Sequence, residues 1–333
     1  MQKNLTIIIP VYNPTISLDE ILSNVYKQKS QNFDVILAID RPKEIDFITV
    51  DELSKKMGSR LKVIFNTSHK HIDIVIKESL ELVTTQYIYV LYSYCKLKSE
   101  FIQRLDVFLD SFTNKPDFIE MPGFNKSISH SLIKSDILPP LGLIDLEKNK
   151  LPFALVTPFV FNCFIKKEIA KTIFDNQKFR DLNLEYSPNF VFRALINSKT
   201  FAYFPDTWIE NWNNSFSMFN PKSLTRSWNF IFSFVNDDDK ELKEALEFSK
   251  FMNYCYYVAG ILSTYKTKRN SMEWKALENV KLSLINEIKT LKPHWTDLIN
   301  NNKYFVKFKV ITLFNLTDGL LKKWEQIFKK FIW

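Results

Sequence analysis

Residues 5–13 read LTIIIPVYN, and this stretch decides the fold. Leu5 to Val11 is a continuous, largely β-branched apolar run that leads into turn residues up to Pro14. A short apolar run bounded by turn residues is typical of a strand buried on both faces. Residues 17–27 follow with apolar side chains at helical spacing. A buried strand followed by an amphipathic helix is the first half of a βαβ unit.

The same alternation continues to about residue 120. Further apolar runs occur at Phe33–Ile39, Leu61–Phe65, Tyr87–Leu91 and Asp117–Met121, and helical spacing recurs over 72–83 and 101–112. This pattern predicts an α/β fold with a mostly parallel sheet and flanking helices. Ligands bind such sheets at the carboxyl ends of the strands. The residues that follow the runs are therefore candidate ligand contacts: Pro10, Tyr12, Asn13, Asp40, Asn66 and 92–95.

The composition bounds the class of protein. The chain has 333 residues, of which 46% are apolar and 25% charged, as in ordinary globular proteins. Only 5 residues are Gly, which excludes glycine-rich phosphate loops. The 3 Cys are far apart and lack metal-ligand spacing, so we expect no disulfide framework and a reducing cytoplasm. No apolar stretch reaches about 18 residues, so we expect no membrane span.

The chain divides into two predicted regions. Residues 121–220 are irregular and rich in Pro, with helical pieces at Lys166–Phe174 and Phe190–Leu195. From Ser223 the pattern is helical to about Lys289, and Pro293 is expected to interrupt it. We therefore predict an α/β region over 1–220 and a helical region over 221–333.

The last residues form a basic and apolar segment. Residues 301–333 carry seven Lys and two acidic residues, a net charge of +5. One predicted helical face is apolar and aromatic, and the other carries Lys323 and further lysines; the apolar face holds Leu320, Trp324, Ile327, Phe328 and Phe331. Such a helix is typical of an anionic membrane surface. Residues 303–310 repeat this chemistry.

Two other fates of this tail compete with membrane binding. An amphipathic helix more commonly docks on the core of its own protein. Basic and aromatic residues also bind nucleic acids, but the amphipathic geometry is cleaner than a base-stacking surface requires. We therefore predict a membrane partner and no nucleic acid.

Several segments resemble the family 2 glycosyltransferases, which have a GT-A fold. Thr6–Asn13 looks like the opening strand of that family, which leads into the nucleotide-sugar site. Residues 34–40 resemble its next strand, which ends in acidic residues near the base, here Asp40 alone. Residues 86–91 resemble its fourth strand, and Thr157–Glu168 resembles the segment that opens the acceptor half. The resemblance covers residues 4–215 and implies a nucleotide-sugar donor, in particular a UDP-sugar.

The resemblance implies a set of donor contacts at the strand ends: Pro10, Tyr12, Asn13, Asp40, Tyr92 and Tyr94. In the family, the fourth strand delivers an Asp-x-Asp motif for Mg²⁺ or Mn²⁺, but residues 92–95 read YSYC. Hard divalent cations need oxygen ligands, usually carboxylates. The family's metal site therefore lacks its ligands here, and we predict no metal or other cofactor. From the residues alone, Tyr92 and Tyr94 either pack as ordinary aromatics or stack on a base or sugar, and Asp40 is either a ligand or a turn former.

The resemblance also indicates where a catalytic base belongs. The family's Glu-Asp pair falls where this chain reads Leu184–Pro188, so Glu185 is the candidate base and Asp181 the second choice. Trp208 and Trp212 are four positions apart and are either acceptor contacts or core residues.

Low Gly content, many Phe and a basic tail also resemble glycolipid-forming family members of small wall-less bacteria. The resulting hypothesis is a hexosyltransferase that acts on a lipid or glycan acceptor, peripheral on the cytoplasmic face of the cell membrane. The alternative is a catalytically degenerate homologue that acts as a binding or partner protein, because the acidic motifs are missing.

Overall fold

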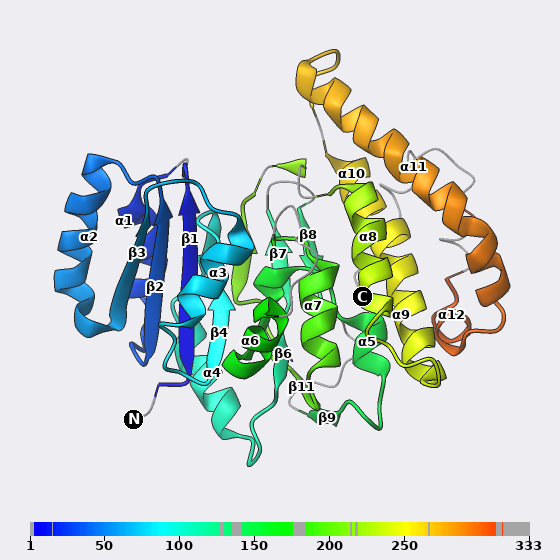
Figure 1. Cartoon of the computed structure of the whole chain (residues 1–333), viewed down its shortest axis with the longest axis horizontal. Helices are drawn as coiled ribbons and strands as arrows, with labels where there is room; N and C mark the ends of the chain where they lie inside the picture. Colours follow the sequence, from blue (N-terminus) through cyan, green and yellow to red (C-terminus); the bar gives the residue numbers. More distant parts are fainter. Residues whose placement is uncertain are drawn as a thin grey trace.

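The computed structural model describes residues 3–14, 16–126, 130–134, 142–175, 184–213, 215–216, 219–265, 267–310 and 315. Two sheets form the centre of the molecule, and a group of helices covers one end (Figure 1). The larger sheet contains β1 (Leu5–Tyr12), β2 (Phe33–Asp40), β3 (Leu61–Asn66), β4 (Tyr87–Val90), β6 (Phe118–Glu120), β9 (Leu143–Asp145), β10 (Cys163–Lys166) and β11 (Thr200–Tyr203). The smaller sheet contains β5 (Cys95–Leu97), β7 (Gly123–Asn125), β8 (Ser131–Ile133) and β12 (Ile209–Asn211).

The larger sheet has the strand order β3-β2-β1-β4-β10-β6-β11-β9. β1 pairs in parallel with β2 and β4, and β2 pairs in parallel with β3. β10 runs antiparallel between β4 and β6 and joins the two halves. All five strands predicted within the first 121 residues are present, and the predicted α/β class is confirmed.

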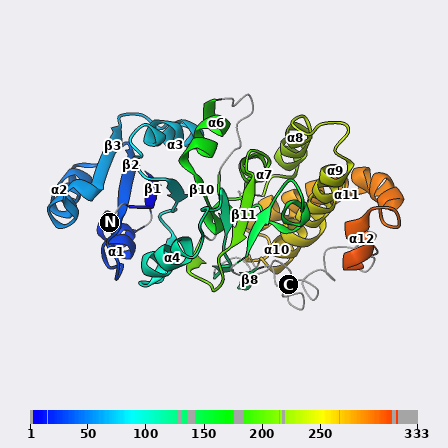
Figure 2. The same cartoon turned by 90° about the horizontal axis from the view of Figure 1, so that it is seen from below.

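Helices cover both faces of the parallel half. They are α1 (Leu18–Tyr26), α2 (Glu44–Met57), α3 (Ile72–Leu80), α4 (Phe101–Asp110) and α6 (Lys167–Asp175). Figure 2 shows α3 and α6 on one face of the sheet and α1 and α4 on the other. Ser17 caps α1 by accepting a hydrogen bond from the backbone N–H of Glu20, which fixes where that helix starts.

Helix α2 was not predicted. It buries only Val50, Leu53 and Met57, while Ile45, Phe47 and Ile48 are exposed. Its apolar residues therefore lie on two sides, and the pattern lacks a single apolar face.

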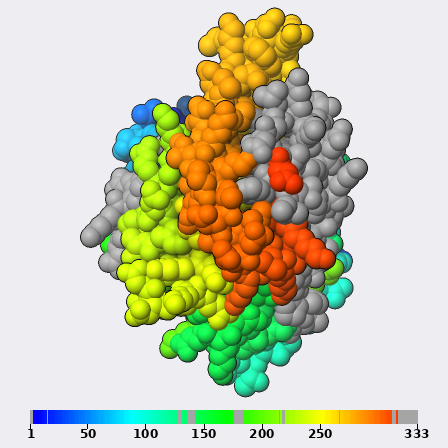
Figure 3. Space-filling view, turned by 90° about the vertical axis from the view of Figure 1, so that its right-hand side faces the viewer, coloured from blue at the N-terminus to red at the C-terminus, as the bar shows by residue number. Residues whose placement is uncertain are grey.

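The second half of the chain adds α5 (Leu151–Leu155) and α7 (Pro188–Ile196) beside the sheet. The C-terminal helices are α8 (Pro221–Phe232), α9 (Lys240–Met252), α10 (Ala259–Thr264), α11 (Met272–Leu298) and α12 (Lys303–Phe308). A π-helical segment, Asn253–Val258, joins α9 directly to α10. Figure 3 shows α11 running along the outside of this group. α8 starts at the boundary expected between 1–220 and 221–333, and the division into two domains stays a prediction.

The expectation that Pro293 interrupts the helix was wrong, because α11 runs through it to Leu298. Proline removes one backbone hydrogen bond and crowds the preceding turn. Tertiary packing beyond the proline stabilises the helix and offsets the lost hydrogen bond. Trp295 is fully buried, with its ring centroid 5.1 Å from that of Phe251.

The segment 303–310 does not present the surface that its sequence indicated. Tyr304 and Phe305 are buried, and Phe305 packs against Phe248 and Phe251 of α9. The aromatic residues of 303–310 therefore dock on the protein's own core, which was the alternative to membrane binding. The predicted membrane residues Leu320, Lys323, Trp324, Ile327, Phe328 and Phe331 lie outside the described residues. Within the described part of the chain, no helix combines the length and hydrophobicity needed to cross a bilayer.

Candidate functional site

The candidate site begins with a row of side chains at one edge of the larger sheet. In the strand register, Tyr12 of β1 stands opposite Asp40 of β2, and Asp40 stands opposite Asn66 of β3. Each is the last residue of its strand. Because the three strands are parallel, the register brings these residues together at the carboxyl edge, where open α/β sheets bind ligands.

Asp40 is the buried centre of this row. Its Oδ1 accepts a hydrogen bond from Nδ2 of Asn66 at 2.8 Å, and its Oδ2 accepts one from the backbone N–H of Lys70 at 2.9 Å. Nδ1 of His69 also lies 2.9 Å from Oδ2. The carboxylate is only 5% exposed. Asp40 therefore holds the 66–70 loop in place and has little capacity left for a direct ligand contact.

His69 and Tyr12 form an aromatic pair above Asp40. Their ring centroids are 3.9 Å apart, and their planes are inclined by 27°. Tyr12 is 52% exposed, so the pair presents ring surface to solvent. A partly exposed ring held by a stacked neighbour is well suited to pack against a flat base.

A cavity of about 230 Å³ extends from this pair into the molecule. It is mostly apolar and is lined by Pro10, Val11, Tyr12, Ala38, Asp40, His69, Lys70, His71, Ile72, Val75, Tyr92, Ser93, Tyr94, Leu184 and Glu185. The structure thus brings the predicted donor contacts Pro10, Tyr12, Asp40, Tyr92 and Tyr94 together with the candidate base Glu185. An apolar cavity with a few convergent polar groups is the usual form of a small-molecule site.

Tyr92 and Tyr94 lie side by side in this cavity. Their rings are parallel within 1°, with centroids 5.6 Å apart. Burial, with a further contribution from the charge of Glu185, raises the pKa of both hydroxyls well above the ordinary value of tyrosine. Both groups therefore stay protonated at physiological pH and can donate hydrogen bonds.

Glu185 reaches the cavity from the segment that precedes α7. Nδ2 of Asn213 donates a hydrogen bond to its Oε2. Burial raises the pKa of the Glu185 carboxyl, and interactions with Tyr94 and Asn213 partly offset that effect. A carboxyl with a raised pKa in a cavity is a candidate acid or base.

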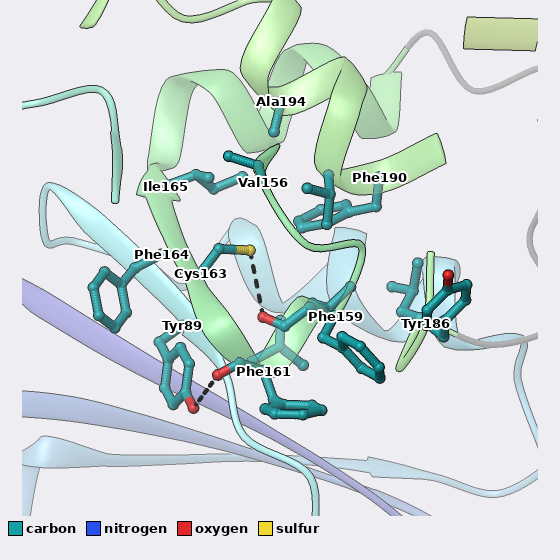
Figure 4. Close-up of a cluster of buried hydrophobic side chains, with 14 of the residues drawn as sticks. Tyr89, Val156, Phe159, Phe161, Cys163, Phe164, Ile165, Tyr186, Phe190 and Ala194 are labelled. Atoms are coloured by element: carbon teal, nitrogen blue, oxygen red, sulfur yellow. Dashed lines mark hydrogen bonds between the residues drawn. The ribbon is translucent and has the colours of Figure 1, made fainter. Parts of the chain in front are cut away.

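The backbone around Glu185 is held on both sides. Its carbonyl accepts a hydrogen bond from the N–H of Val160 at 3.1 Å, and the N–H of Ser187 donates to the carbonyl of Pro158 at 2.9 Å. Tyr186 packs edge-on against Phe159 in the buried cluster of Figure 4. The Tyr186 hydroxyl donates to Oδ1 of Asn253, the first residue of the π-helical segment, at 2.9 Å. The C-terminal helices therefore help to fix the position of Glu185.

Three predicted site residues do not line this cavity, and a fourth lies outside the described residues. Asn13, with a φ of 43°, lines a neighbouring cavity that shares Tyr12 and Asp40 with the first. Trp208 is buried and stacks on Phe204, which is a core position. Trp212 is 43% exposed, and its backbone N–H donates to the carbonyl of Tyr94, so it lies next to the site without lining it. Asp181 lies outside the described residues.

The basic loop of the site, His69, Lys70 and His71, was not among the predicted donor contacts. All three line the cavity. Their place between β3 and α3, on a strand-to-helix loop at the carboxyl edge, was the signal that could have identified them.

The GT-A resemblance implies a divalent cation after the fourth strand, and the side chains there do not fit one. Residues 92–95 contribute two phenols, one hydroxyl and one thiol, and no carboxylate. Among the described residues, no group of three or more His, Cys, Asp or Glu side chains could hold a metal ion. This donor set is poor for Mg²⁺ or Mn²⁺, which bind through carboxylates and water.

Comparison with known proteins agrees with the fold. The sequence matches no family profile and no curated protein. Among solved structures, the chain is similar to residues 1–349 of S. aureus TarS in complex with UDP-GlcNAc, with 12% identity, a TM-score of 0.63, and coverage of 98% of this chain and 90% of that one. It is also similar to TarS 1–349 in complex with UDP, with 12% identity, a TM-score of 0.59 and the same coverage.

A second protein shares this architecture. The mannosyltransferase PcManGT from Pyrobaculum calidifontis, in complex with GDP-Man and Mn²⁺, has 10% identity, a TM-score of 0.53, and coverage of 98% of this chain and 88% of that one. Identities this low show the fold alone. The chain therefore has the α/β fold of GT-A glycosyltransferases, with a helical C-terminal region.

Proposed function

We propose that this chain is a nucleotide-sugar glycosyltransferase whose donor occupies the cavity between Asp40 and Glu185. One observation carries the proposal: strand ends far apart in the sequence, the basic loop 69–71 and a buried carboxyl with a raised pKa converge on one cavity. The fold shared with TarS and PcManGT supports it, because these proteins were solved with UDP-GlcNAc and with GDP-Man respectively.

The cavity suggests the orientation of the donor. The base lies against Tyr12 and His69 at the exposed end, and the sugar lies near Tyr94 and Glu185 at the other. The diphosphate spans the region between them, near His71 and Tyr92. In this arrangement Asp40 does not contact the donor itself; it holds the 66–70 loop, which carries His69 against the base.

Glu185 serves as the general base. It takes the proton of an acceptor hydroxyl, whose oxygen forms a bond to the anomeric carbon of the donor sugar. The bond between that carbon and the diphosphate oxygen breaks, and its electron pair remains on the diphosphate.

The finer parts of the function are also proposals. The donor is a UDP-hexose, and the acceptor is a lipid or glycan at the cytoplasmic face of the cell membrane. The net charge of +5 in residues 301–333 supports an anionic surface as a partner. The alternative is a degenerate homologue that binds a nucleotide or a partner without transfer, because the acidic metal motif is absent.

Isothermal titration of the full chain with UDP, UDP-GlcNAc and GDP-mannose tests the proposal. We expect binding of at least one, and a loss of about tenfold or more on Tyr12→Ala. Phe47→Ala is the matched control, because Phe47 is 48% exposed, much like Tyr12 at 52%, and lies outside the cavity. Absence of binding by all three ligands, or equal losses in both variants, contradicts the donor site. Binding without release of free UDP or sugar transfer favours the degenerate alternative.

A further inference from the structure

We propose that the hydroxyl of Tyr92 binds the diphosphate of the donor, at the place after β4 where the resemblance to GT-A glycosyltransferases implies a divalent cation. This inference rests on the proposed function, because it assigns a part of the same cavity. It concerns a group that ordinary packing does not explain.

The first observation is an unsatisfied polar atom. Tyr92 is 7% exposed, and its hydroxyl has no hydrogen-bond partner among the described residues. Buried hydroxyls are nearly always hydrogen-bonded, since an unpaired one is costly. Two other tyrosines of the same region show the ordinary arrangement: Tyr87 donates to the carbonyl of Pro116 and Tyr89 to the carbonyl of Phe161. Tyr92 differs from both because it lines the cavity, and the hydroxyl of Tyr94, which lines the same cavity, likewise has no hydrogen-bond partner among the described residues.

The second observation is its place in the cavity. Tyr92 stacks on Tyr94, the neighbour of Glu185, and the charges that act on its hydroxyl include those of Glu185 and Asp73. Asp73 belongs to the first turn of α3, and Ile72 and Val75 of the same helix line the cavity together with Glu185. Tyr92 therefore shares one cavity with Glu185 and the start of α3. The proposed orientation of the donor puts its diphosphate in this part of the cavity.

The third observation is the chemistry of the surroundings. α3 begins after His71, and the N-terminal end of a helix favours anions. Lys70 and His71 line the same cavity, with the Lys70 ammonium paired to Glu78. The carboxylates of Asp73 and Glu185 oppose an anion, so neutral donors and the helix end must supply the attraction. A protonated phenol is such a donor, and it forms its bond without a divalent cation.

During transfer, negative charge develops on the diphosphate oxygen that leaves the anomeric carbon. The Tyr92 O–H donates a hydrogen bond to the diphosphate and keeps its proton, while Glu185 takes the acceptor proton. Donors already in place where charge develops are effective in a site that excludes water. The Tyr92 hydroxyl therefore lacks a hydrogen-bond partner in the free protein and gains one when the diphosphate binds.

Tyr92→Phe tests this directly, because it removes only the hydroxyl. UDP and uridine are titrated into the full chain and the variant, each in EDTA and in Mn²⁺. We expect the variant to lose tenfold or more in UDP affinity and to bind uridine as the wild type does. We expect the wild type to bind UDP equally in EDTA and in Mn²⁺. We also expect the melting temperature of Tyr92→Phe to stay unchanged or rise, since no protein hydrogen bond is lost.

Tyr89→Phe is the matched control. It is the same substitution on β4, but its hydroxyl donates to the carbonyl of Phe161 at 2.8 Å in the core (Figure 4). We expect it to lower the melting temperature and leave UDP affinity unchanged.

Three results overturn the inference: unchanged UDP affinity in Tyr92→Phe, equal losses for UDP and uridine, or wild-type UDP binding that requires Mn²⁺. These differ from failure of the proposed function, in which the wild type binds none of UDP, UDP-GlcNAc and GDP-mannose. In that case the inference fails with it.

Discussion

His69 stacks on Tyr12, with ring centroids 3.9 Å apart, and so links the end of β1 to the loop after β3. Its Nδ1 lies 2.9 Å from Oδ2 of Asp40, which fixes the orientation of the imidazole. The platform on which a base would lie is thus built from three strand ends, and its parts can be tested separately.

The first prediction concerns this platform. His69→Ala removes the support of the Tyr12 ring, and we expect UDP affinity to fall by about 1 kcal/mol, or roughly fivefold. His69→Phe keeps the stacking and should retain most of the affinity. His130→Ala is the control, because His130 also packs against an aromatic ring, that of Phe124, away from the cavity. Titration calorimetry measures all three, and an equal effect of the two alanine variants would contradict the platform.

The second prediction concerns the stability of the 66–70 loop. Asp40→Ala leaves Asn66, His69 and the backbone N–H of Lys70 without their shared acceptor. We expect the free energy of unfolding, measured in urea, to fall by about 2–4 kcal/mol. Asp46→Ala is the comparison, since its carboxylate accepts one hydrogen bond, from the N–H of Lys43 before α2. That loss should be about 1 kcal/mol. Equal losses of stability in the two variants would indicate that Asp40 is an ordinary turn residue.

The third prediction concerns catalysis. Glu185→Gln should lower kcat about 10²- to 10⁴-fold and leave UDP affinity within about twofold, because the amide cannot accept the proton. Because burial raises the pKa of Glu185, the direction of the pH dependence of kcat can also be tested. A base works only when deprotonated, so the rising limb of kcat against pH should lie above the ordinary range of a glutamate. Glu210→Gln is the control, because Glu210 lies outside the cavity. Retained turnover in Glu185→Gln would show that Glu185 is not the base, and Asp181 would be tested next.

The fourth prediction concerns stability and pH. Glu120 is 2% exposed, and burial raises its pKa to about 8, although Thr157 donates two hydrogen bonds to Oε1. A carboxyl with a raised pKa in the folded state contributes stability that is complete below its unfolded value of 4.5 and is lost as the pH rises through about 8. Between these values we expect a slope of up to about −1.4 kcal/mol per pH unit. Urea unfolding of the wild type and Glu120→Gln measures it; an equal slope in both would show that Glu120 is not the source.

The fifth prediction concerns the tail. Replacing Trp324 and Phe328 with Ser should reduce co-sedimentation with anionic vesicles at low salt, because both lie on the predicted apolar face. Leu282→Ser on α11 is the control, since Leu282 is 57% exposed and lies far from the tail in sequence. The membrane hypothesis fails if the wild type ignores these vesicles or if the double variant binds them equally well.

The sheet was predictable because its strands are continuous apolar runs. Leu5–Val11 and Phe33–Ile39 are short and rich in β-branched residues, which favours strands covered on both faces, and every residue of β2 is buried. Helix α2 escaped prediction because tertiary contacts select Val50 and Leu53 while Ile45 stays exposed. The helix was wrongly expected to end at Pro293, because a local sequence pattern does not show that Trp295 packs against Phe251.

The site was predictable where a strand leads directly into it. Tyr12, Asp40 and Tyr92 follow apolar runs, so their convergence follows from a parallel sheet. Glu185 was located only through resemblance to a family, and the structure then placed it in the same cavity. The loop 69–71 was not predicted because its residues are polar and follow β3 only after Asn66, although its place at the carboxyl edge of the sheet was a usable signal.

The π-helical segment Asn253–Val258 sets the rotational phase of a continuous helix. A π turn accommodates an extra residue within an α-helix, and such segments are frequent at functional sites. An extra residue inserted into regular α-helix would rotate everything after it by about 100°. The wider π turn takes up that residue, so the buried face of α10 continues in phase with that of α9. Asn253 can therefore bond to Tyr186 at the start of this segment while α10 keeps its packing at the other end.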